Sequence, residues 1–391
     1  MVDRDLAPQL RKAAEAFPAV TLTGPRQSGK STLCRGVFPD RPYVNLESPD
    51  VRAFAIDDPR GFLAAHAGGA ILDEVQRAPD LPSWLQPIID DDPAPGRWIL
   101  TGSQHLPLSE TIGQSLAGRT RILHLLPLAR PEVERFTDHP TDFEGSLLAG
   151  GYPRICDQGI EPGTWLQSYV ATYIERDVRT ISNVGNLTKF QRFVQLCAGR
   201  TANLLNLSGL AGDAGITQPT ARTWLSILET TFLVHRLPAF HTNERKRLVK
   251  MPKLHFHDVG LAAWLLGIRR REHLDAHPLR GSLFETWVVS EIFKHRSNRG
   301  ETAGMFTLRD RDGREADVLV ETGDRRLLVE VKASRTIPNG ALGQLESVAE
   351  LLPADGRPVH RIVVYAGDES QRRSDGEIVS WRDLASVDWV T

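Results

Sequence analysis

The sequence predicts an α/β protein with more than one domain. Its 391 residues exceed what one ordinary core holds. In the N-terminal third, short apolar runs alternate with stretches of helical length, which is typical of a parallel sheet covered by helices. After about residue 281 a second mixture of helices and strands begins. Apolar residues make up 41% and charged residues 25%, as in globular proteins.

Composition excludes several classes of protein. No run of about 18 uncharged apolar residues occurs, so no membrane span is expected. The charged N-terminus lacks the apolar core of a signal peptide. The three cysteines lie far apart without metal-ligand spacing, which favours reduced thiols and a cytoplasmic location. The net charge of −2 provides no global attraction to nucleic acid, although a local basic face remains open.

The first predicted domain covers residues 1–135 and contains a parallel sheet. Each of its strands is a short apolar run, and the intervening segments are long enough for helices. The expected strands are 19–23, 43–47, 70–74 and 97–103.

The second predicted domain, residues 136–250, is helical and ends in a winged helix. A short helix over 205–215 and a longer one over 216–237, started by Thr217 and Pro219, form a helix-turn-helix. The basic stretch 244–256 then suggests a wing hairpin.

The third predicted domain covers residues 251–391 and mixes helices with strands. The apolar spacing predicts helices over 281–296 and 341–352. Strands are expected at 305–310, 315–321, 326–334 and 361–367.

The segment GPRQSGKS matches the phosphate-loop pattern G-x-x-x-x-G-K-[ST], between a predicted strand and a helix. Backbone N–H groups of such a turn and the helix N-terminus attract phosphate oxygens. Lys30 would contact the β- and γ-phosphates of ATP, and the Ser31 hydroxyl would bind Mg²⁺. The alternative is an ordinary glycine turn before a helix. The expected nucleotide contacts are Gly24, Pro25, Arg26, Gln27, Ser28, Gly29, Lys30, Ser31, Thr32 and Asp73.

In AILDEVQ, the strand AILDE ends in two carboxylates that complete a hydrolytic site. Asp73 would hold Mg²⁺ through water, and Glu74 would polarise the attacking water. After the next strand, Ser103 or Gln104 would lie between the γ-phosphate and Glu74 and sense hydrolysis; a plain polar loop is the alternative.

Arg119 and Arg121 follow in SLAGRTRILHLLPL. An arginine beside the γ-phosphate of a neighbouring subunit would stabilise charge in the transition state, which predicts an ATP-dependent homo-oligomer with Arg119 as the catalytic arginine. A solvated surface arginine is the alternative.

These segments resemble a known family. GPRQSGKST, LDEVQRAPDL, LTGSQ and GRTRILHLLPL resemble the AAA+ ATPase domain of a prokaryotic family in which the ATPase precedes a C-terminal domain of unknown function. KMPKLHFHDVGLAAWLLG, GSLFETWVVSEIFK, EADVLVE and LLVEVKAS resemble that C-terminal domain. The resemblance covers nearly the whole chain and implies an AAA+ fold and ATP binding, but no particular substrate.

A second site is predicted in the C-terminal domain. Glu330 and Lys332 project to the same face of a strand, and the turn TGDR brings Asp317 toward them from the preceding strand. Neighbouring carboxylates repel unless a cation lies between them. Mg²⁺ there would contact a phosphodiester, and Lys332 would orient or deprotonate a water.

This D…E-x-K arrangement is similar to the core of restriction-endonuclease-like nucleases. The resemblance implies that Asp317 and Glu330 are metal ligands, Lys332 is catalytic, Glu285 is a supporting ligand and Gln344 is an accessory polar residue. Glu315 shares the Asp317 face and is the alternative ligand. Half-exposed strands also alternate charge routinely, and such folds also serve as inert binding platforms.

Polar residues of the helix-turn-helix have the chemistry to contact DNA. A protein-interaction or spacer module is the alternative. The candidates are Gln218, Thr220, Arg222 and Thr223 on the second helix, and Arg245, Lys246, Arg247 and Lys250 on the wing. In HFHDVG, Asp258 is expected to cap a helix, with a metal site at the histidines as the alternative.

Together these patterns predict an ATP-hydrolysing enzyme coupled to a DNA-directed, Mg²⁺-dependent nuclease-like domain. The alternatives are an ATP-dependent switch and a transcription regulator, in both of which the C-terminal domain does not cleave.

Overall fold

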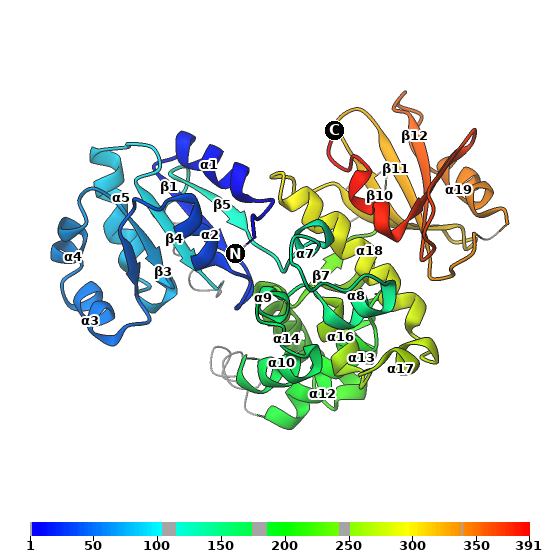
Figure 1. The fold of residues 1–391 in the computed structure, drawn as a ribbon, viewed down its shortest axis with the longest axis horizontal. Coiled ribbons are helices and arrows are strands. Elements are labelled where there is room, and N and C mark those ends of the chain that lie inside the picture. The colour runs from blue at the N-terminus through cyan, green and yellow to red at the C-terminus, as the bar shows by residue number, and fades with distance from the viewer. Residues whose placement is uncertain (1, 104–114, 174–185, 242–250, 338) are drawn as a thin grey trace. The chain divides into compact units, whose positions relative to one another are not determined.

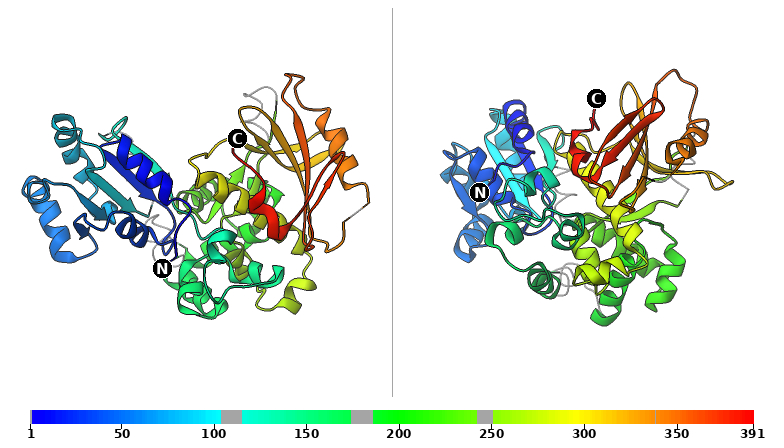
Figure 2. Two further views of the ribbon diagram at one scale, coloured as in Figure 1. Left: turned by 45° about the horizontal axis from the view of Figure 1, so that its top comes forward. Right: turned by 45° about the vertical axis from the view of Figure 1, so that its right-hand side comes forward.

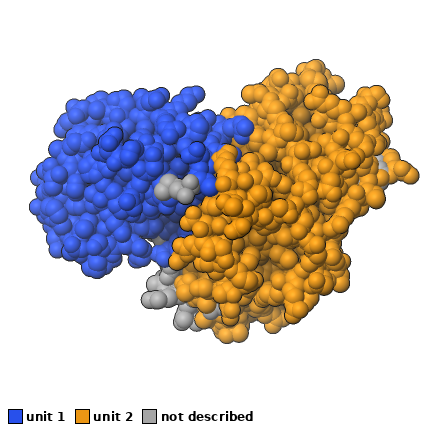
Figure 3. All heavy atoms as spheres, in the orientation of Figure 1, with its two compact units in different colours: residues 1–128, 230–232, 297–300 blue, residues 129–229, 233–296, 301–391 orange. Residues whose placement is uncertain are grey.

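The computed structural model describes residues 2–103, 115–173, 186–241, 251–337 and 339–391. The chain divides into two compact units (Figure 3). Unit 1 contains residues 1–128, 230–232 and 297–300, and unit 2 contains the remainder. Apart from residues 230–232 and 297–300, the segments predicted as second and third domains both lie in unit 2.

Unit 1 is built on a sheet of five parallel strands in the order β2-β3-β4-β1-β5 (Figure 1). Four strands lie where the sequence predicts them. The fifth, β5, was missed because it is an edge strand that leaves Arg121 and Ile122 exposed and lacks a continuous apolar run. The strands are β1 (Ala19–Thr23), β2 (Tyr43–Asn45), β3 (Ala70–Asp73), β4 (Trp98–Gly102) and β5 (Thr120–His124).

Helices cover both faces of this sheet. One face packs against α1 and α2, and the other packs against α4 and α5. Every residue of β1, β3 and β4 is buried, and cover from both sides explains why these strands are mainly apolar. The helical elements are α1 (Ala7–Ala16), α2 (Lys30–Val37), α3 (Pro49–Asp57), α4 (Pro59–Ala65), η1 (Val75–Arg77) and α5 (Leu81–Asp91).

The first half of unit 2 is helical and includes a three-stranded sheet in the order β6-β8-β7. Its two strand pairs are antiparallel. The helices are α7 (Arg130–Val133), α8 (Phe143–Ala149), α9 (Pro153–Gln158), α10 (Pro162–Tyr169), α12 (Leu187–Ala198), α13 (Leu207–Ala214) and α14 (Gln218–Thr230), and the strands are β6 (Asn203–Leu204), β7 (Val234–Leu237) and β8 (Lys253–Phe256).

The predicted helix over 216–237 is wrong in its second part. Helix α14 ends at Thr230, and Phe232 has a left-handed backbone with φ of 57°. The following residues form β7, which pairs with β8. The apolar run of this segment suits either structure, and pairing with a distant strand decided the outcome.

The C-terminal half of unit 2 contains a six-stranded sheet in the order β13-β14-β12-β11-β10-β9, coloured yellow-orange to red in Figure 2. Helix α18 packs on one face and α19 on the other. The predicted helices and strands of this part are confirmed to within a few residues. Its elements are α16 (Val259–Leu265), α17 (Arg271–Asp275), α18 (Arg280–Ser297), β9 (Met305–Arg309), β10 (Glu315–Glu321), β11 (Arg326–Lys332), α19 (Ala341–Ala349), β12 (Val359–Tyr365), β13 (Gln371–Arg373), β14 (Gly376–Ser380) and η3 (Trp381–Ser386).

Across the residues that the structure describes, no helix combines the length and apolar character needed to cross a membrane.

Candidate functional site

The phosphate loop connects β1 to α2 through a backbone that needs glycine. Gly29, directly before α2, has a left-handed φ of 93°. A Cβ atom on Gly24 would lie 2.1 Å from the carbonyl oxygen of Leu125. Side chains are therefore excluded at both positions, and the backbone N–H groups remain accessible to an anion.

Lys30 is the first residue of α2 and is only 5% exposed. Its ammonium donates hydrogen bonds to the carbonyl oxygens of Gly24 at 3.0 Å and Pro25 at 2.9 Å. Burial lowers the pKa of Lys30, and the carboxylates of Glu74 and Asp73 oppose this shift. The loop thus holds a buried cation where phosphate charge is expected.

The Asp73 carboxylate, at the end of β3, accepts three side-chain hydrogen bonds. Ser31 donates to Oδ2 at 2.8 Å and Tyr43 to the same oxygen at 2.5 Å, while Thr101 donates to Oδ1. Sequence analysis missed Tyr43 and Thr101, which lie on β2 and β4, the two neighbours of β3. In the sequence, the one indication of their contact with Asp73 was their position in predicted strands.

These residues fit ATP with Mg²⁺. The Ser31 hydroxyl and the Asp73 carboxylate are oxygen ligands of the type that Mg²⁺ prefers, and they already lie side by side. The Ser28 hydroxyl is fully buried and has no hydrogen-bond partner among the described residues. Buried polar groups are normally paired, so an acceptor at this loop would complete its bonding.

Glu74 follows β3 in a left-handed conformation with φ of 57° and ψ of 46°. Burial raises the pKa of its carboxyl, and Lys30 opposes that shift. The side-chain amide of Gln76 donates to Glu74 Oε2 and, at 3.0 Å, to Ser103 Oγ. The structure therefore links Ser103 to Glu74 through Gln76, a residue that sequence analysis did not single out. Gln104 lies outside the described residues.

Arg4 also supports the phosphate loop, a role that the sequence did not predict. Its guanidinium donates to the carbonyl oxygens of Ser28 at 2.7 Å and Leu126 at 2.8 Å. It thereby ties the phosphate loop to the segment after β5. An arginine ahead of an N-terminal helix offers no local signal for this role.

Three further residues predicted for the nucleotide site are paired with carboxylates or exposed. The Arg119 guanidinium forms a bidentate salt bridge with the Asp90 carboxylate of α5, with hydrogen bonds of 2.6 and 2.8 Å. Arg26 lies 3.7 Å from Glu47, and Thr32 is exposed on α2. A role for Arg119 in a neighbouring subunit would require its pair with Asp90 to open.

In unit 2, the predicted carboxylate site contains a lysine that sequence analysis missed. The ammonium of Lys253, from β8, lies 2.8 Å from Glu285, 2.8 Å from Glu315 and 3.2 Å from Asp317. The second oxygen of Asp317 accepts a 2.9 Å hydrogen bond from the backbone N–H of Val331. The sequence did contain an indication of this role, because Lys253 lies in the mainly apolar segment KLHF and a buried lysine requires a charged partner.

The remaining predicted residues form a separate pair, in which Lys332 contacts Glu330 at 2.5 Å. Burial raises the pKa of Glu285 to about 8 and that of Glu330 to about 7, with the Asp317 charge adding to both shifts. Burial lowers the pKa of Lys253, but its carboxylate neighbours outweigh this and raise it overall.

The ammonium of Lys253 therefore occupies the position between the carboxylates at which the sequence predicted a metal ion. Within the described part of the chain, no group of three or more His, Cys, Asp or Glu side chains is placed to hold a metal ion. Gln344, the predicted accessory residue, is exposed on α19.

The helix-turn-helix leaves Gln218, Arg222 and Thr223 exposed on α14, whereas Thr220 is partly buried. The four basic residues of the predicted wing lie outside the described residues. Asp258 is confirmed as a helix cap, because its carboxylate accepts a 2.8 Å hydrogen bond from Leu261 N–H at the start of α16.

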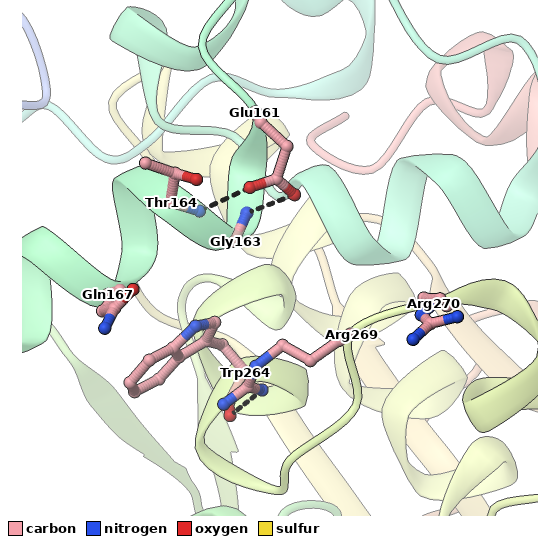
Figure 4. Close-up of a pocket in the computed structure, with 7 residues that line it drawn as sticks. All are labelled: Glu161, Gly163, Thr164, Gln167, Trp264, Arg269 and Arg270. Carbon is pink, nitrogen blue, oxygen red and sulfur yellow. Dashed lines mark hydrogen bonds between the residues drawn. The ribbon is translucent and has the colours of Figure 1, made fainter.

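A pocket of about 460 Å³ lies between α10 and the segment after α16 (Figure 4). Glu161 uses its carboxylate to cap α10, and the Arg269 guanidinium lies 4.4 Å from the centre of the Trp264 ring. None of the residues predicted for ATP or DNA chemistry lines this pocket, so it is not the site of the predicted chemistry.

Comparisons with known proteins divide the chain in three. Residues 16–134 match a family described as AAA domain, residues 140–272 a domain of unknown function (DUF8612), and residues 280–384 a domain of unknown function (DUF4143). The uncharacterized proteins Rv2008c of Mycobacterium tuberculosis and Mb2031c of Mycobacterium bovis are each 30% identical over 375 residues, covering 95% of this chain and 82% of theirs.

Among solved structures, the Walker-type ATPase PABY2304 of Pyrococcus abyssi is similar over 68% of this chain and 96% of its own. The TM-score is 0.48 and the sequence identity 16%.

Proposed function

This chain belongs to the family of proteins in which an AAA domain precedes a domain of unknown function (DUF4143), and on that premise we propose that it is an ATP hydrolase whose turnover switches what unit 2 binds. One observation carries the proposal. The sequence assigns Lys30 to phosphate binding, Ser31 and Asp73 to Mg²⁺ binding, and Glu74 to water activation. These four residues are joined by hydrogen bonds or close charges around a glycine-dependent loop.

Each residue has a role in this proposal. Mg²⁺ would neutralise phosphate charge, held by Ser31 directly and by Asp73 through water. Lys30 would exchange its contacts with Gly24 and Pro25 for the β- and γ-phosphates. Glu74 would accept a proton from water as the water oxygen bonds to the γ-phosphorus. The bond from that phosphorus to the bridging oxygen breaks, and ADP leaves with the electron pair.

The test is Lys30→Ala, compared with Lys12→Ala on the exposed surface of α1. Titration calorimetry with MgATP is expected to show binding in wild type and Lys12→Ala and at least a 100-fold loss in Lys30→Ala, by the order of magnitude of charged contacts to phosphate. Unchanged affinity in Lys30→Ala would remove the phosphate loop from the binding site.

A second candidate is a DNA-directed nuclease in the C-terminal half of unit 2. The observation in its favour is the convergence of Glu285, Glu315 and Asp317 on one cationic point, with Lys332 close by on Glu330. Mg²⁺ or Mn²⁺ would have to displace the Lys253 ammonium from that point. We rank the switch first because the carboxylates already have a cation that belongs to the chain.

Plasmid, linear and single-stranded DNA incubated with Mg²⁺ or Mn²⁺, with and without ATP, separates these candidates. Cleavage by wild type that is lost in Asp317→Asn and Lys332→Met, while ATP hydrolysis continues, would establish the nuclease. No cleavage of any substrate supports the switch. Cleavage that persists in Asp317→Asn would come from another site or from contamination.

DNA is the proposed partner in both cases, and the exposed polar face of α14 supports this. Arg222 on that face is available for a phosphate or base contact. Sequence-selective duplex binding without cleavage would favour the transcription regulator, and the absence of DNA binding would favour a protein-interaction module.

A further inference from the structure

We propose that Gln76 is a positioning residue for ATP hydrolysis: its side-chain amide ties Glu74 to Ser103 and so holds the carboxylate in place for the attacking water. The inference rests on the proposed function of the phosphate-loop site. It assigns a role to a residue outside the motif residues that bind phosphate or Mg²⁺.

The hydrogen bonds of the Gln76 amide carry this inference. Nε2 has two hydrogens, and its two acceptors are Glu74 Oε2 and Ser103 Oγ, the latter at 3.0 Å. The planar amide fixes the directions of both bonds. The reverse orientation would point the amide oxygen at a carboxylate oxygen, which is repulsive, so the bonding partners determine the orientation.

The anchor at the far end of this bridge is buried at the end of a strand. Ser103 is 2% exposed and directly follows β4, which lies beside β3 in the sheet. Through Gln76, the end of β4 is therefore connected to the side chain that follows β3.

The backbone of Glu74 explains why such a connection is needed. Its φ of 57° and ψ of 46° are unusual for a residue with a Cβ atom, and they take it out of the strand direction. The sheet hydrogen bonds that align Asp73 no longer align Glu74. The short helix η1, which begins at the fully buried Val75, brings Gln76 back toward the Glu74 carboxylate.

The side-chain oxygen of Gln76 indicates where the attacking water would bind. Its Oε1 is buried and has no hydrogen-bond partner among the described residues. Buried acceptors are normally paired, and the attacking water is a donor that would arrive with the nucleotide. Nε2 contacts one carboxylate oxygen of Glu74, so the other is not engaged by Gln76 and can take the proton.

The experiment separates hydrogen bonding from packing. Gln76→Met keeps the length and bulk of the side chain but removes both donors. We expect its kcat for ATP to fall about 10- to 100-fold, since a small misplacement of a catalytic group costs up to that much. The Kd for MgATP, measured by calorimetry, should stay within about twofold, because Gln76 supports the base and not the phosphates. Gln86→Met, at a glutamine of α5 in the same unit, is the matched control.

A double-mutant cycle then tests whether Gln76 acts through Glu74. In single-turnover measurements, Gln76→Met should have little further effect in the Glu74→Gln background, because residues that act as a unit are not additive. An undiminished effect there, or wild-type kcat in Gln76→Met alone, would overturn the inference while leaving the ATPase intact. Absence of hydrolysis in wild type would overturn the proposed function, and the inference with it.

Discussion

The Ser31 hydroxyl donates a 2.8 Å hydrogen bond to the Asp73 carboxylate, although 42 positions separate the two residues in the chain. The bond joins the N-terminus of α2 to the carboxyl end of β3. Both residues were predicted as Mg²⁺ contacts from two independent motifs. Their proximity means that a Mg²⁺ ion bound there would need little rearrangement of the protein.

Ser31→Ala should weaken ATP binding about tenfold in the presence of Mg²⁺ and change it little in the presence of EDTA, because the variant loses a metal ligand and keeps Lys30. Calorimetry under both conditions measures the difference. Ser83→Ala, in α5, controls for loss of a hydroxyl. Equal weakening with and without Mg²⁺ would assign Ser31 to the phosphates.

Glu74→Gln should bind MgATP with nearly unchanged affinity and hydrolyse it about 10²- to 10⁴-fold more slowly, since the amide cannot accept the proton of the water. Steady-state phosphate release and calorimetry measure the two quantities. Turnover close to wild type in this variant would place the base elsewhere.

ATP should promote self-association, and Arg119 should contribute to hydrolysis only within the assembly. In the Glu74→Gln background, light scattering with saturating MgATP should report an oligomer. Arg119→Ala should lower kcat by about 10³-fold or more without loss of ATP binding. Asp90→Ala releases Arg119 from its pair and should leave kcat at or above that of wild type. A monomer that hydrolyses ATP at full rate would contradict this prediction.

Lys253→Met should destabilise unit 2 by about 3–5 kcal/mol, the usual result of removing one partner from a buried charge cluster. Glu285, Glu315 and Asp317 would then face one another without a cation. Urea unfolding followed by tryptophan fluorescence measures the loss. Lys332→Met is the matched control and should cost less, because the Lys332 side chain is 32% exposed and that of Lys253 only 6%. Equal losses of unfolding free energy in the two variants would show that the Lys253 charge does not stabilise the three carboxylates.

The stability of unit 2 should fall as pH rises from about 4.5 to about 8. Burial raises the pKa of Glu285 to about 8 from an ordinary 4.5, so the folded state holds this proton more tightly than the unfolded state does. The resulting stabilisation is complete below about 4.5 and is lost as pH passes the folded value. Glu330, with a pKa raised to about 7, acts in the same direction.

Glu285→Gln should flatten this dependence by up to a few kcal/mol, because the amide cannot lose a proton in that range. Lys253 does not contribute to the slope, since its raised pKa acts only above its ordinary value of 10.5. Unfolding free energies at several pH values test the prediction. Parallel profiles for wild type and variant would contradict it.

The sequence by itself determined the phosphate loop and most of the elements that present it. The glycine spacing, the lysine and the serine of the phosphate loop are recognised within a few residues. The buried strands β1, β3 and β4 are mainly apolar and have turn or helix residues on either side. Edge strand β5 and the end of α14 were mistaken, because an exposed strand has little apolar signal and an apolar run does not distinguish helix from strand.

Only the tertiary structure decided which charged and polar groups meet. Lys253 lies 32 positions from Glu285 and 64 from Asp317, and Arg4 lies 24 from Ser28. The bridge from Glu74 through Gln76 to Ser103 likewise depends on β3 and β4 lying side by side. Local sequence patterns predict helices, strands and turns, because these depend on the spacing of apolar residues and on turn-forming residues. The partner of a buried charge is set by the packing of distant segments, because desolvation penalises every buried charge that does not find one.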